Sequence, residues 1–564
     1  MRSKYRMVAM VMAVGCAWAM EEMPVWAAAA GTPSALTGAE SGAQLSRLRE
    51  YLERERVAKE IAEAKAKKHT KVENKTEEAG KEAVSAVKFK VNGFNIPDSK
   101  VLTAEEVAKI TTPYIGKEIE LKSLYEVVGQ INKLYEDKGY ITCRAMLPPQ
   151  TIKKGMVTIR LVEGTTGTVS VEGNKSTRTG YIKDRIDIQP GKVKNIKELN
   201  KDLLLFNAAN DVQLRISMKA GTEPGTTDYE IKAYEPQRQI WTVYEDNAGS
   251  ESTGQWRTGL FYNNRSLRGV RDNLSIGTLD SVGNKSFFAN YSTPLGRSGT
   301  KLAVQYSTNS IKITHGEMEP LRVRGHAYAA NVGLTQPLVV TDNFRSEAGL
   351  TFNKQHSRTD FSGIRWLDDD LKDWTASYAA TNYGDSFVLY HKYSYTYGNY
   401  QKPEIDIADY VSPSEDKNYG VYAFNGFYQK SYKHRQMIGV RLDLQYSATS
   451  YLPSARQFYI GGANSVRGYK ESVLSGDKGF FLSCQYDIPV FNKSTNAFVF
   501  YDLGGVYGDS STDTHTLSGT GFGIKTTFKN KIFASLTLGM PLKREYNGTD
   551  AGSVRLHFLL SGQF

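Results

Sequence analysis

The stretch of sequence that decides the fold reads Val554-Arg555-Leu556-His557-Phe558-Leu559-Leu560-Ser561-Gly562-Gln563-Phe564. Its side chains alternate between apolar and polar with a period of two residues, which is the period of a β-strand. One face carries Val554, Leu556, Phe558, Leu560 and Phe564, and the other carries Arg555, His557, Ser561 and Gln563. A strand of this kind lies at a boundary between an apolar and a polar environment.

The same alternation extends back along the chain to about residue 237. It is clear in segments 255–262, 301–306 and 532–538, and helical periodicity is absent from this whole region. The region also holds 25 of the 34 tyrosines of the chain. If each strand with its connection takes about 20 residues, residues 237–564 form about 16 antiparallel strands.

A soluble β-sandwich or propeller would also alternate, so alternation alone leaves two fold classes open. Three observations together favour a transmembrane β-barrel. The N-terminus carries an export signal, the tyrosine content suits the aromatic girdles of a barrel, and Phe564 stands directly on a strand.

The N-terminal segment 1–30 has the pattern of a secretory signal peptide. Arg2, Lys4 and Arg6 precede an apolar stretch at 7–20, and small cleavage-site residues follow at 27–30. A retained membrane helix is the weaker interpretation because Glu21, Glu22 and Pro24 interrupt the run, and a lipoprotein-type site at Cys16 is weaker still. After cleavage Cys143 and Cys484 remain, too far apart in sequence to suggest a disulfide framework or a metal cluster.

Residues 31–83 form a lead-in followed by a highly charged helix. Segment 44–82 carries four pairs of Glu and a basic residue four positions later, which stabilise a helix, but its apolar stripe is thin. The stripe consists of Leu45, Leu48, Leu52 and Ile61. This helix is therefore either a solvated linker or a polar plug inside a water-filled pore.

Two repeats of one pattern lie between this helix and the barrel, at 84–164 and 165–236. In the first, strand 88–94 precedes a capping box at Thr103 and Glu106, a helix over 121–138 that Gly139 ends, and strands 140–145 and 157–163. In the second, strand 168–172 precedes a short helix at 178–186, a helix opened by Asn195, and strands 212–218 and 229–233. The order β-α-α-β-β, found twice, predicts a tandem of small α+β domains.

Composition argues against several other classes of protein. The net charge is +11, but basic and acidic residues are mixed along the chain, which disfavours nucleic-acid binding. No Gly-x-Ser-x-Gly elbow or His-Glu-x-x-His helix is present, so we expect no enzyme activity, and the eight His show no metal-like spacing. We interpret Asp368-Asp369-Asp370 as part of a solvated extracellular loop, with calcium binding as a minor alternative. No cofactor is expected.

At this point the sequence resembles the TpsB transporters of two-partner secretion, which are relatives of the barrel-assembly proteins. Five motifs carry the resemblance, which covers nearly the whole mature chain: Leu147-Pro148-Pro149-Gln150 with Gly155, Val162-Glu163-Gly164, Val171-Glu172-Gly173-Asn174, the lumen-loop signature Gly461-Gly462-Ala463-Asn464-Ser465-Val466-Arg467-Gly468-Tyr469, and Phe498-Val499-Phe500-Tyr501-Asp502-Leu503-Gly504. The resemblance implies two periplasmic POTRA-type domains and a 16-stranded outer-membrane barrel of a Gram-negative-type bacterium.

The resemblance also implies a long loop that folds back into the barrel lumen. Its signature is Val466, Arg467, Gly468 and Tyr469, and its partners on the wall are Asp502 and Phe500. An aspartate facing lipid is costly, so Asp502 should face the lumen, where it can accept a bidentate hydrogen bond from Arg467. Without the resemblance, the simpler interpretation is an exposed Arg467 and a solvated Asp502.

The implied function is export of an unfolded partner exoprotein of the haemolysin or adhesin type. POTRA-type sheets can bind an extended chain by strand addition. Further implied partners are outer-membrane lipid and, during biogenesis, the barrel-assembly machinery. The alternative is an insertase for outer-membrane proteins, which shares the loop and the POTRA-type domains. A porin or receptor would lack the periplasmic repeats.

Overall fold

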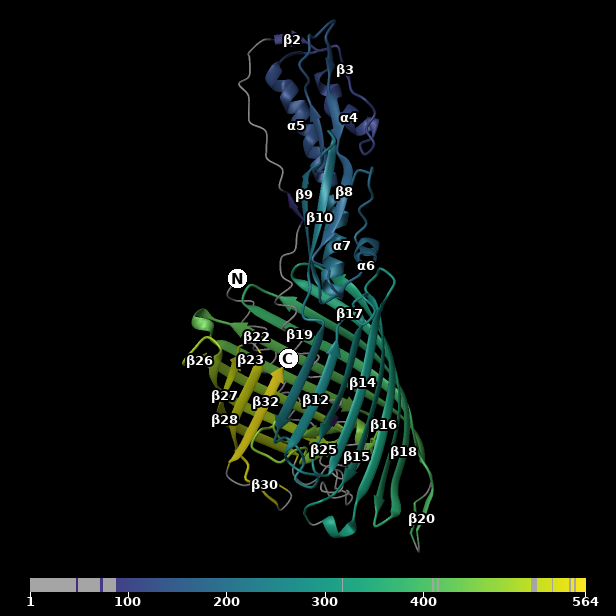
Figure 1. The fold of residues 1–564 in the computed structure, drawn as a ribbon, viewed down its shortest axis with the longest axis vertical. Helices are drawn as coiled ribbons and strands as arrows, with labels where there is room; N and C mark the ends of the chain where they lie inside the picture. The colour runs from purple at the N-terminus through teal and green to yellow at the C-terminus, as the bar shows by residue number, and fades with distance from the viewer. Residues whose placement is uncertain are drawn as a thin grey trace.

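We describe the protein from a computed structural model of the 564-residue chain. The structure describes residues 47–48, 72–74, 88–316, 318–407, 410–412, 415–508, 515–529, 531–546, 549–551 and 554–564. The predicted signal peptide lies outside these residues, as does the charged helix 44–82 apart from residues 47–48 and 72–74. A column of two small domains stands on one end of a wide barrel (Figure 1).

Among the described residues, sixteen antiparallel strands close into a barrel, which confirms the predicted fold class. The strands are β11 (Gln239–Asp246), β12 (Arg257–Asn264), β13 (Asn273–Asp280), β14 (Asn284–Leu295), β15 (Thr300–Lys312), β16 (Arg324–Val340), β17 (Phe344–Phe361), β18 (Ile364–Tyr383), β19 (Phe387–Lys402), β22 (Glu415–Ser431), β23 (Met437–Ser447), β26 (Lys478–Pro489), β27 (Thr495–Tyr507), β28 (Thr516–Phe528), β29 (Ile532–Pro541) and β32 (Arg555–Gln563). Each strand pairs with the next, and β11 pairs with β32.

Short strands and 3-10 helices lie in the connections between the barrel strands. These are η2 (Glu319–Leu321), β20 (Ile405–Ile407), β21 (Tyr410–Ser412), η3 (Lys433–Arg435), η4 (Ser454–Arg456), β24 (Phe458–Ile460), β25 (Leu474–Gly476), β30 (Glu545–Tyr546) and β31 (Thr549–Asp550). The paired strands β24 and β25 belong to the long segment that connects β23 to β26.

The final strand shows why the alternation predicts a barrel. Val554, Leu556 and Leu560 are 40% to 52% exposed on the outer surface, where the bilayer would cover them. Arg555 and His557 on the other face contact Glu251 and the backbone of Gly468, as described below. The two faces of one strand therefore meet two different surroundings.

The seam between β11 and β32 is shorter than its neighbours. It has five paired residues, from Thr242 with Gln563 to Asp246 with Leu559, whereas β11 and β12 share eight. Side-chain amide groups extend it: Nδ2 of Asn247 donates to the carbonyl of Leu556 (2.7 Å), and its Oδ1 accepts from the N–H of Phe558 (2.8 Å). Backbone hydrogen bonds between Trp241 and Phe564 and from the N–H of Asn247 to the carbonyl of Phe558 also continue the seam, and the Asn247 side chain reinforces its second end.

The first periplasmic-type domain contains β2 (Lys88–Lys90), β3 (Gly93–Asn95), α4 (Ala104–Thr111), η1 (Thr112–Tyr114), β4 (Glu118–Glu120), α5 (Leu121–Lys138), β5 (Cys143–Met146), β6 (Met156–Thr158) and β7 (Arg160–Glu163). The predicted capping box of Thr103 and Glu106 is present, and Gly139 ends α5 in the left-handed conformation. Strand β4, which pairs with β2, was not predicted because three residues are too few to show a period.

The second domain contains β8 (Thr165–Glu172), α6 (Thr179–Arg185), α7 (Ile196–Ala209), β9 (Gln213–Ala220) and β10 (Thr226–Tyr234). Asn195 caps α7 by accepting from the N–H groups of Lys197 and Glu198, as its position predicts. The sheet has the order β1-β9-β10-β8, in which β1 (Glu73–Asn74) comes from the segment before the first domain. Leu199, Leu203 and Phe206 of α7 pack on this sheet.

One sequence interpretation is wrong. Asp368, Asp369 and Asp370 do not lie in a loop, because strand β18 continues through them. Asp369 is only 4% exposed and accepts from the hydroxyl of Tyr400 (3.3 Å), and Asp368 and Asp370 lie near basic side chains. Strand β18 therefore continues through a charged run in which the sequence shows no alternation of apolar and polar residues. No helix in the described part of the chain is both long and apolar enough to cross a bilayer.

Candidate functional site

The predicted signature lies at the tip of the segment between β24 and β25. Gly461, Gly462 and Gly468 all have φ near +103°, which residues with a side chain rarely adopt. At Gly468 the chain passes directly over β29, so a Cβ there would lie 2.8 Å from the backbone of Met540. The glycines therefore let the loop turn and lie close to the wall.

The structure brings Arg467 and Asp502 together. Nε of Arg467 donates to Oδ2 of Asp502 at 2.7 Å, and Nη2 donates to Oδ1 at 2.9 Å. The backbone N–H of Arg467 adds a third hydrogen bond to Oδ2 at 3.1 Å. Asp502 is completely buried, and the side chain of Arg467 is 12% exposed. This is the bidentate geometry in which an arginine fixes a carboxylate most firmly.

Phe500, the second predicted partner, lies beneath the guanidinium group. The central carbon of Arg467 is 3.4 Å from the centre of the Phe500 ring, and Phe500 itself is 4% exposed. A flat cation over an aromatic face gains electrostatic energy when water is excluded. Phe500 and Asp502 share the inner face of β27, so one strand supplies both contacts.

Two further partners of Arg467 were missed in the sequence. Ser483 donates to Oδ1 of Asp502 at 2.6 Å and accepts from Nη2 of Arg467 at 3.2 Å. Gln485 accepts from Nη1 at 3.0 Å. Both residues lie on β26, which pairs with β27 in a register that sets Ser483 opposite Asp502. The sequence shows that Ser483 and Gln485 are two residues apart and so share one face of a strand. It does not show which strand lies beside Asp502.

Val466 and Tyr469 fix the loop tip on either side of Arg467. Val466 is fully buried in a cluster with Ile460 and Val506. The hydroxyl of Tyr469 lies 2.9 Å from the carbonyl oxygens of Ser518 and Lys543 and accepts the N–H of Lys543 at 3.1 Å. Each residue of the signature therefore has its own role. Val466 packs against the wall, Arg467 pairs with Asp502, Gly468 lets the chain turn, and Tyr469 makes polar contacts with the wall.

A second set of contacts ties the loop to the first and last barrel strands. Glu251, between β11 and β12, pairs with Lys470 of the loop and with Arg555 of β32, both at 2.7 Å. Glu471 of the loop accepts the N–H of Ala463 at 2.6 Å. The sequence placed Arg555 on the inner face of the last strand, but Glu251 carried no signal that would have identified it.

A third tether lies upstream, where Arg456 in η4 contacts Asp373 of β18. Its Nε donates to Oδ2 of Asp373 at 3.0 Å, its Nη2 also contacts that oxygen, and the hydroxyl of Tyr419 donates to the same carboxylate at 2.7 Å. The side chains of Arg456 and Asp373 are 6% and 2% exposed. A buried pair of this kind is costly to break, because either partner alone would be an unpaired charge.

Leu48, in the segment predicted to form the charged helix, is 4% exposed and packs inside the barrel. It belongs to one cluster with Tyr244 of β11, Leu279 of β13, and Ala327 and Ala329 of β16. These residues come from strands on one side of the wall. A residue that precedes the periplasmic-type domains by about 40 positions thus contacts the inner wall of the barrel.

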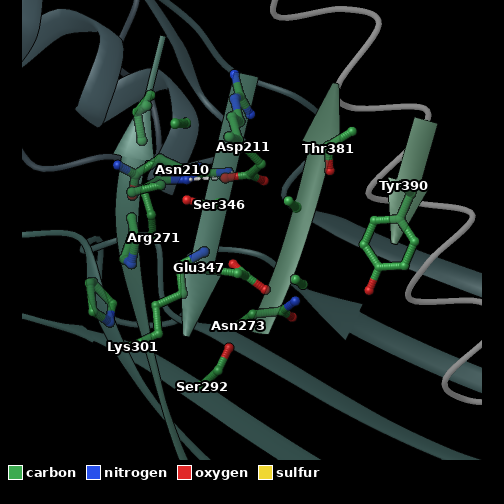
Figure 2. A pocket seen from close by; sticks show the side chains of 18 of the residues that line it. Asn210, Asp211, Arg271, Asn273, Ser292, Lys301, Ser346, Glu347, Thr381 and Tyr390 are labelled. Carbon is green, nitrogen blue, oxygen red and sulfur yellow. Dashed lines mark hydrogen bonds and ion pairs between the residues drawn. The ribbon is translucent and has the colours of Figure 1, made fainter. Parts of the chain in front are cut away.

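A polar cavity of about 220 Å³ lies where the second domain meets the barrel. Figure 2 shows Asn210 and Asp211, which follow α7, beside Arg271, Glu347 and Thr381 of the barrel side. Arg271 donates through Nε to Oδ1 of Asp211 at 2.8 Å, so an ion pair bridges the boundary.

A second carboxylate lies at the link that leads from the second domain into the barrel. Glu235, between β10 and β11, accepts hydrogen bonds from the N–H and hydroxyl groups of Ser176 and Thr177. Burial raises the pKa of Glu235, but these hydrogen bonds together outweigh burial and leave the pKa below its ordinary value of 4.5. In the part of the chain that the structure describes, no group of His, Cys, Asp and Glu is arranged to hold a metal ion.

Two family models match this chain. A family model described as haemolysin secretion/activation protein ShlB/FhaC/HecB matches residues 225–526, and a model for the ShlB-type POTRA domain matches residues 89–164. The heme/hemopexin transporter protein HuxB of Haemophilus influenzae is 23% identical over 486 residues, 82% of this chain and 86% of that protein. The outer membrane transporter CdiB of Escherichia coli is 24% identical over 477 residues, 80% and 79% of the two chains.

Among solved structures, CdiB from Escherichia coli superimposes with a TM-score of 0.67 at 19% identity, covering 93% of this chain and 98% of that one. At this identity the likeness establishes the fold. The first family model spans more than half of the chain, and together with the POTRA match it covers most of the barrel and the first small domain.

Proposed function

Since the chain belongs to the haemolysin secretion/activation protein family, a family of outer-membrane transporters of secreted partner proteins, we propose that it exports one exoprotein of the haemolysin or adhesin type. The chain is an outer-membrane β-barrel whose POTRA-type domains lie in the periplasm. In this proposal the periplasmic domains receive the unfolded exoprotein and the barrel conducts it to the cell surface.

The observation that carries the proposal is the loop held inside the barrel by Arg467 and Asp502. A porin needs no such element, whereas an exporter must keep a wide pore closed to small molecules until its cargo arrives. Because Asp502 is completely buried, moving Arg467 away would leave its carboxylate without a charged partner. The pair, with Phe500, Ser483 and Gln485 around it, gives the loop one defined resting position.

We further propose that the N-terminal helix is the plug of the resting pore. Leu48 supports this, because it packs against Tyr244, Leu279 and two alanines of the inner wall. A helix whose exposed faces are charged and whose apolar stripe is thin suits a polar lumen with one small apolar patch. Export then requires that both the helix and the loop move out of the lumen when the cargo passes.

The boundary between the second domain and the barrel supports delivery of cargo at the pore mouth. The ion pair of Arg271 with Asp211 and the hydrogen bond from the Ser266 hydroxyl to the carbonyl of Ser176 hold the domain at this end of the barrel. The polar cavity beside them is lined by side chains of both signs, which suits the passage of an extended chain of varied sequence.

Deletion of the gene, followed by comparison of proteins in the culture medium, tests the proposal. We expect one large exoprotein to disappear from the medium and to return when the wild-type gene is supplied. The matched control is the Arg435→Ala variant, which changes an exposed residue in η3 and should restore export fully. If the medium is unchanged while the levels of other outer-membrane barrel proteins fall, the chain is an insertase.

A further inference from the structure

Two lysines face outward from the barrel wall on neighbouring strands. In β17, Asn353 and Gln355 are buried on the inner face, and Lys354 between them is exposed. In β18, Asp373 is buried on the inner face and the adjacent Lys372 is exposed. The register sets Lys354 directly opposite Lys372, so their Cβ atoms are about 5 Å apart on the outer surface.

The pair stands at the outer boundary of the apolar band of the barrel. Arg345 and Glu347, at the start of β17, line the cavity beside the second domain, so β17 runs away from the periplasm. Residues 344–352 span about 23 Å at a strand tilt of about 40°, close to an apolar band of about 25 Å. Phe352 and Trp374 face outward at the end of this span, with their ring centres 5.0 Å apart. Aromatic side chains of this kind mark the membrane interface, so the lysines lie at the level of the outer headgroups.

The charged side chains further from the membrane are paired with one another. His356 lies 3.1 Å from Asp370, and Arg365 lies 3.0 Å from Asp368. By contrast, neither lysine of the opposed pair has an acidic partner among the residues that the structure describes. Like charges directly opposite each other destabilise a sheet. An anion placed between the two ammonium groups removes this repulsion.

The surroundings of the lysines suit a phosphate group at a membrane surface. Ammonium groups bind phosphate oxygens as point charges, and two of them can hold one phosphate that carries two negative charges. Ala330 of β16 stands opposite Lys354, is exposed and is short, so it leaves the wall beside the pair open. Asn399 of β19 stands opposite Lys372 and adds a polar amide. The wall is therefore cationic at this level and apolar directly below it.

We infer that Lys354 and Lys372 bind a phosphate of the outer-leaflet glycolipid, the lipid A headgroup of lipopolysaccharide. Its acyl chains then lie over the outward-facing row formed by Val332, Phe352 and Trp374. Divalent cations hold the phosphates of neighbouring glycolipids together, and the two ammonium groups take the place of such a cation at the protein wall. The site lies on the outer wall, so it acts independently of the lumen loop and of the exported exoprotein.

Titration of the purified full-length protein in detergent with bisphosphorylated lipid A tests the site. The variant is Lys354→Gln with Lys372→Gln, which removes both charges and leaves polar side chains in their place. The readout is the rise of the unfolding temperature with lipid concentration, followed by heat-dependent mobility on a gel. We expect at least fivefold tighter binding to the wild type than to the variant, and binding within twofold of each other overturns the inference.

The matched control is Lys430→Gln with Lys433→Gln. It removes the same number of charges at the periplasmic end of the barrel, in β22 and in the turn that follows it. Its binding of lipid A should stay within twofold of the wild type. An equal loss in the two double variants would show a general effect of net charge and would overturn the inference.

The lipid-free proteins show whether the variant is merely misfolded. Because the substitutions remove two opposed charges, the unfolding temperature of the Lys354→Gln, Lys372→Gln variant without lipid should equal or exceed that of the wild type. A lower unfolding temperature would mean that the lysines themselves support the sheet, and the inference would be wrong.

Three further probes identify the anion. Lipid A without its phosphates should bind the wild type and the lysine variant equally. Phosphatidylglycerol should also bind both within twofold, and excess inorganic phosphate should displace less than half of the bound lipid A. If phosphatidylglycerol distinguishes the two proteins as strongly as lipid A does, or if inorganic phosphate displaces the lipid fully, the assignment to the outer-leaflet glycolipid is wrong.

Discussion

The guanidinium carbon of Arg467 lies 3.4 Å from the centre of the Phe500 ring, and the same group pairs with Asp502 two residues further along β27. One arginine is thus held by an aromatic face and a carboxylate of a single strand, and by Ser483 and Gln485 of the next. The site is asymmetric: it suits a planar cation on the loop and an anion on the wall, and not the reverse.

This asymmetry predicts how substitutions of Arg467 rank. Arg467→Lys keeps the charge but loses the bidentate pair and the flat stacking, so export should fall several-fold. Arg467→Ala leaves Asp502 buried without a charged partner, a loss of about 3–5 kcal/mol for such pairs, and export should fall at least tenfold. Exoprotein in the medium, normalised to barrel protein in the membrane, is the measurement.

The charge-reversed double variant Arg467→Asp with Asp502→Arg should restore less than a tenth of export. An arginine at position 502 would no longer lie over Phe500, and an aspartate at 467 would face Gln485. Full export by Arg467→Ala would refute an anchoring role for the pair. Full rescue by the reversed pair would show that charge alone matters.

The seam residue Asn247 gives a prediction about barrel stability. Asn247→Ala removes two hydrogen bonds to the backbone of β32, and each polar group left without a partner costs about 1–3 kcal/mol. We expect the folded barrel to unfold at a temperature several degrees lower, measured by heat-dependent mobility on a gel. The control is Asn425→Ala, whose amide contacts Asp443 within the continuous pairing of β22 and β23. Equal shifts in the two variants would contradict a special role of the seam.

Glu235 gives a prediction about pH. Its pKa in the folded protein is below 4.5, so the unfolded state binds protons more readily and the group stabilises the junction at neutral pH. This stabilisation is fully present above the ordinary value of 4.5 and is lost as pH falls through the lowered pKa. Limited proteolysis between pH 7 and pH 3 should show the link near residues 235–238 becoming cleavable only at the acid end.

The Glu235→Gln variant is the matched test of that assignment. An amide cannot take up the proton, so the change in cleavage over this pH range should be smaller than in the wild type, and cleavage at pH 7 should be greater. An unchanged pH profile in the variant would assign the transition to another group.

The N-terminal helix gives a prediction about conductance. Deletion of residues 44–70 should raise the ion conductance of the purified protein in planar bilayers, because it removes Leu48 from the inner wall. Leu48→Asp should act in the same direction but more weakly, since a charge against Tyr244 and Leu279 is unfavourable. Deletion of residues 31–43 serves as the control, and equal conductance in all three proteins would exclude a plug.

The sequence alone was sufficient to predict the barrel and the repeated small domains. Two-residue alternation, as in 554–564, and the helix caps at Thr103 and Asn195 are local signals that act between neighbours in the chain. The local signals failed where the chain segment was too short, as in β4, or where a charged run hid a strand, as at Asp368 to Asp370.

Only the tertiary structure decided which residues meet. Ser483 stands opposite Asp502 because of the register between β26 and β27, and β1 lies on β9 although more than 140 residues separate them. A register is fixed by the sum of many side-chain contacts along two strands, which no single stretch of sequence contains. The final strand 554–564 shows both parts: its alternation indicated a strand with one apolar and one polar face, and its closure with β11, reinforced by Asn247, was visible only in the fold.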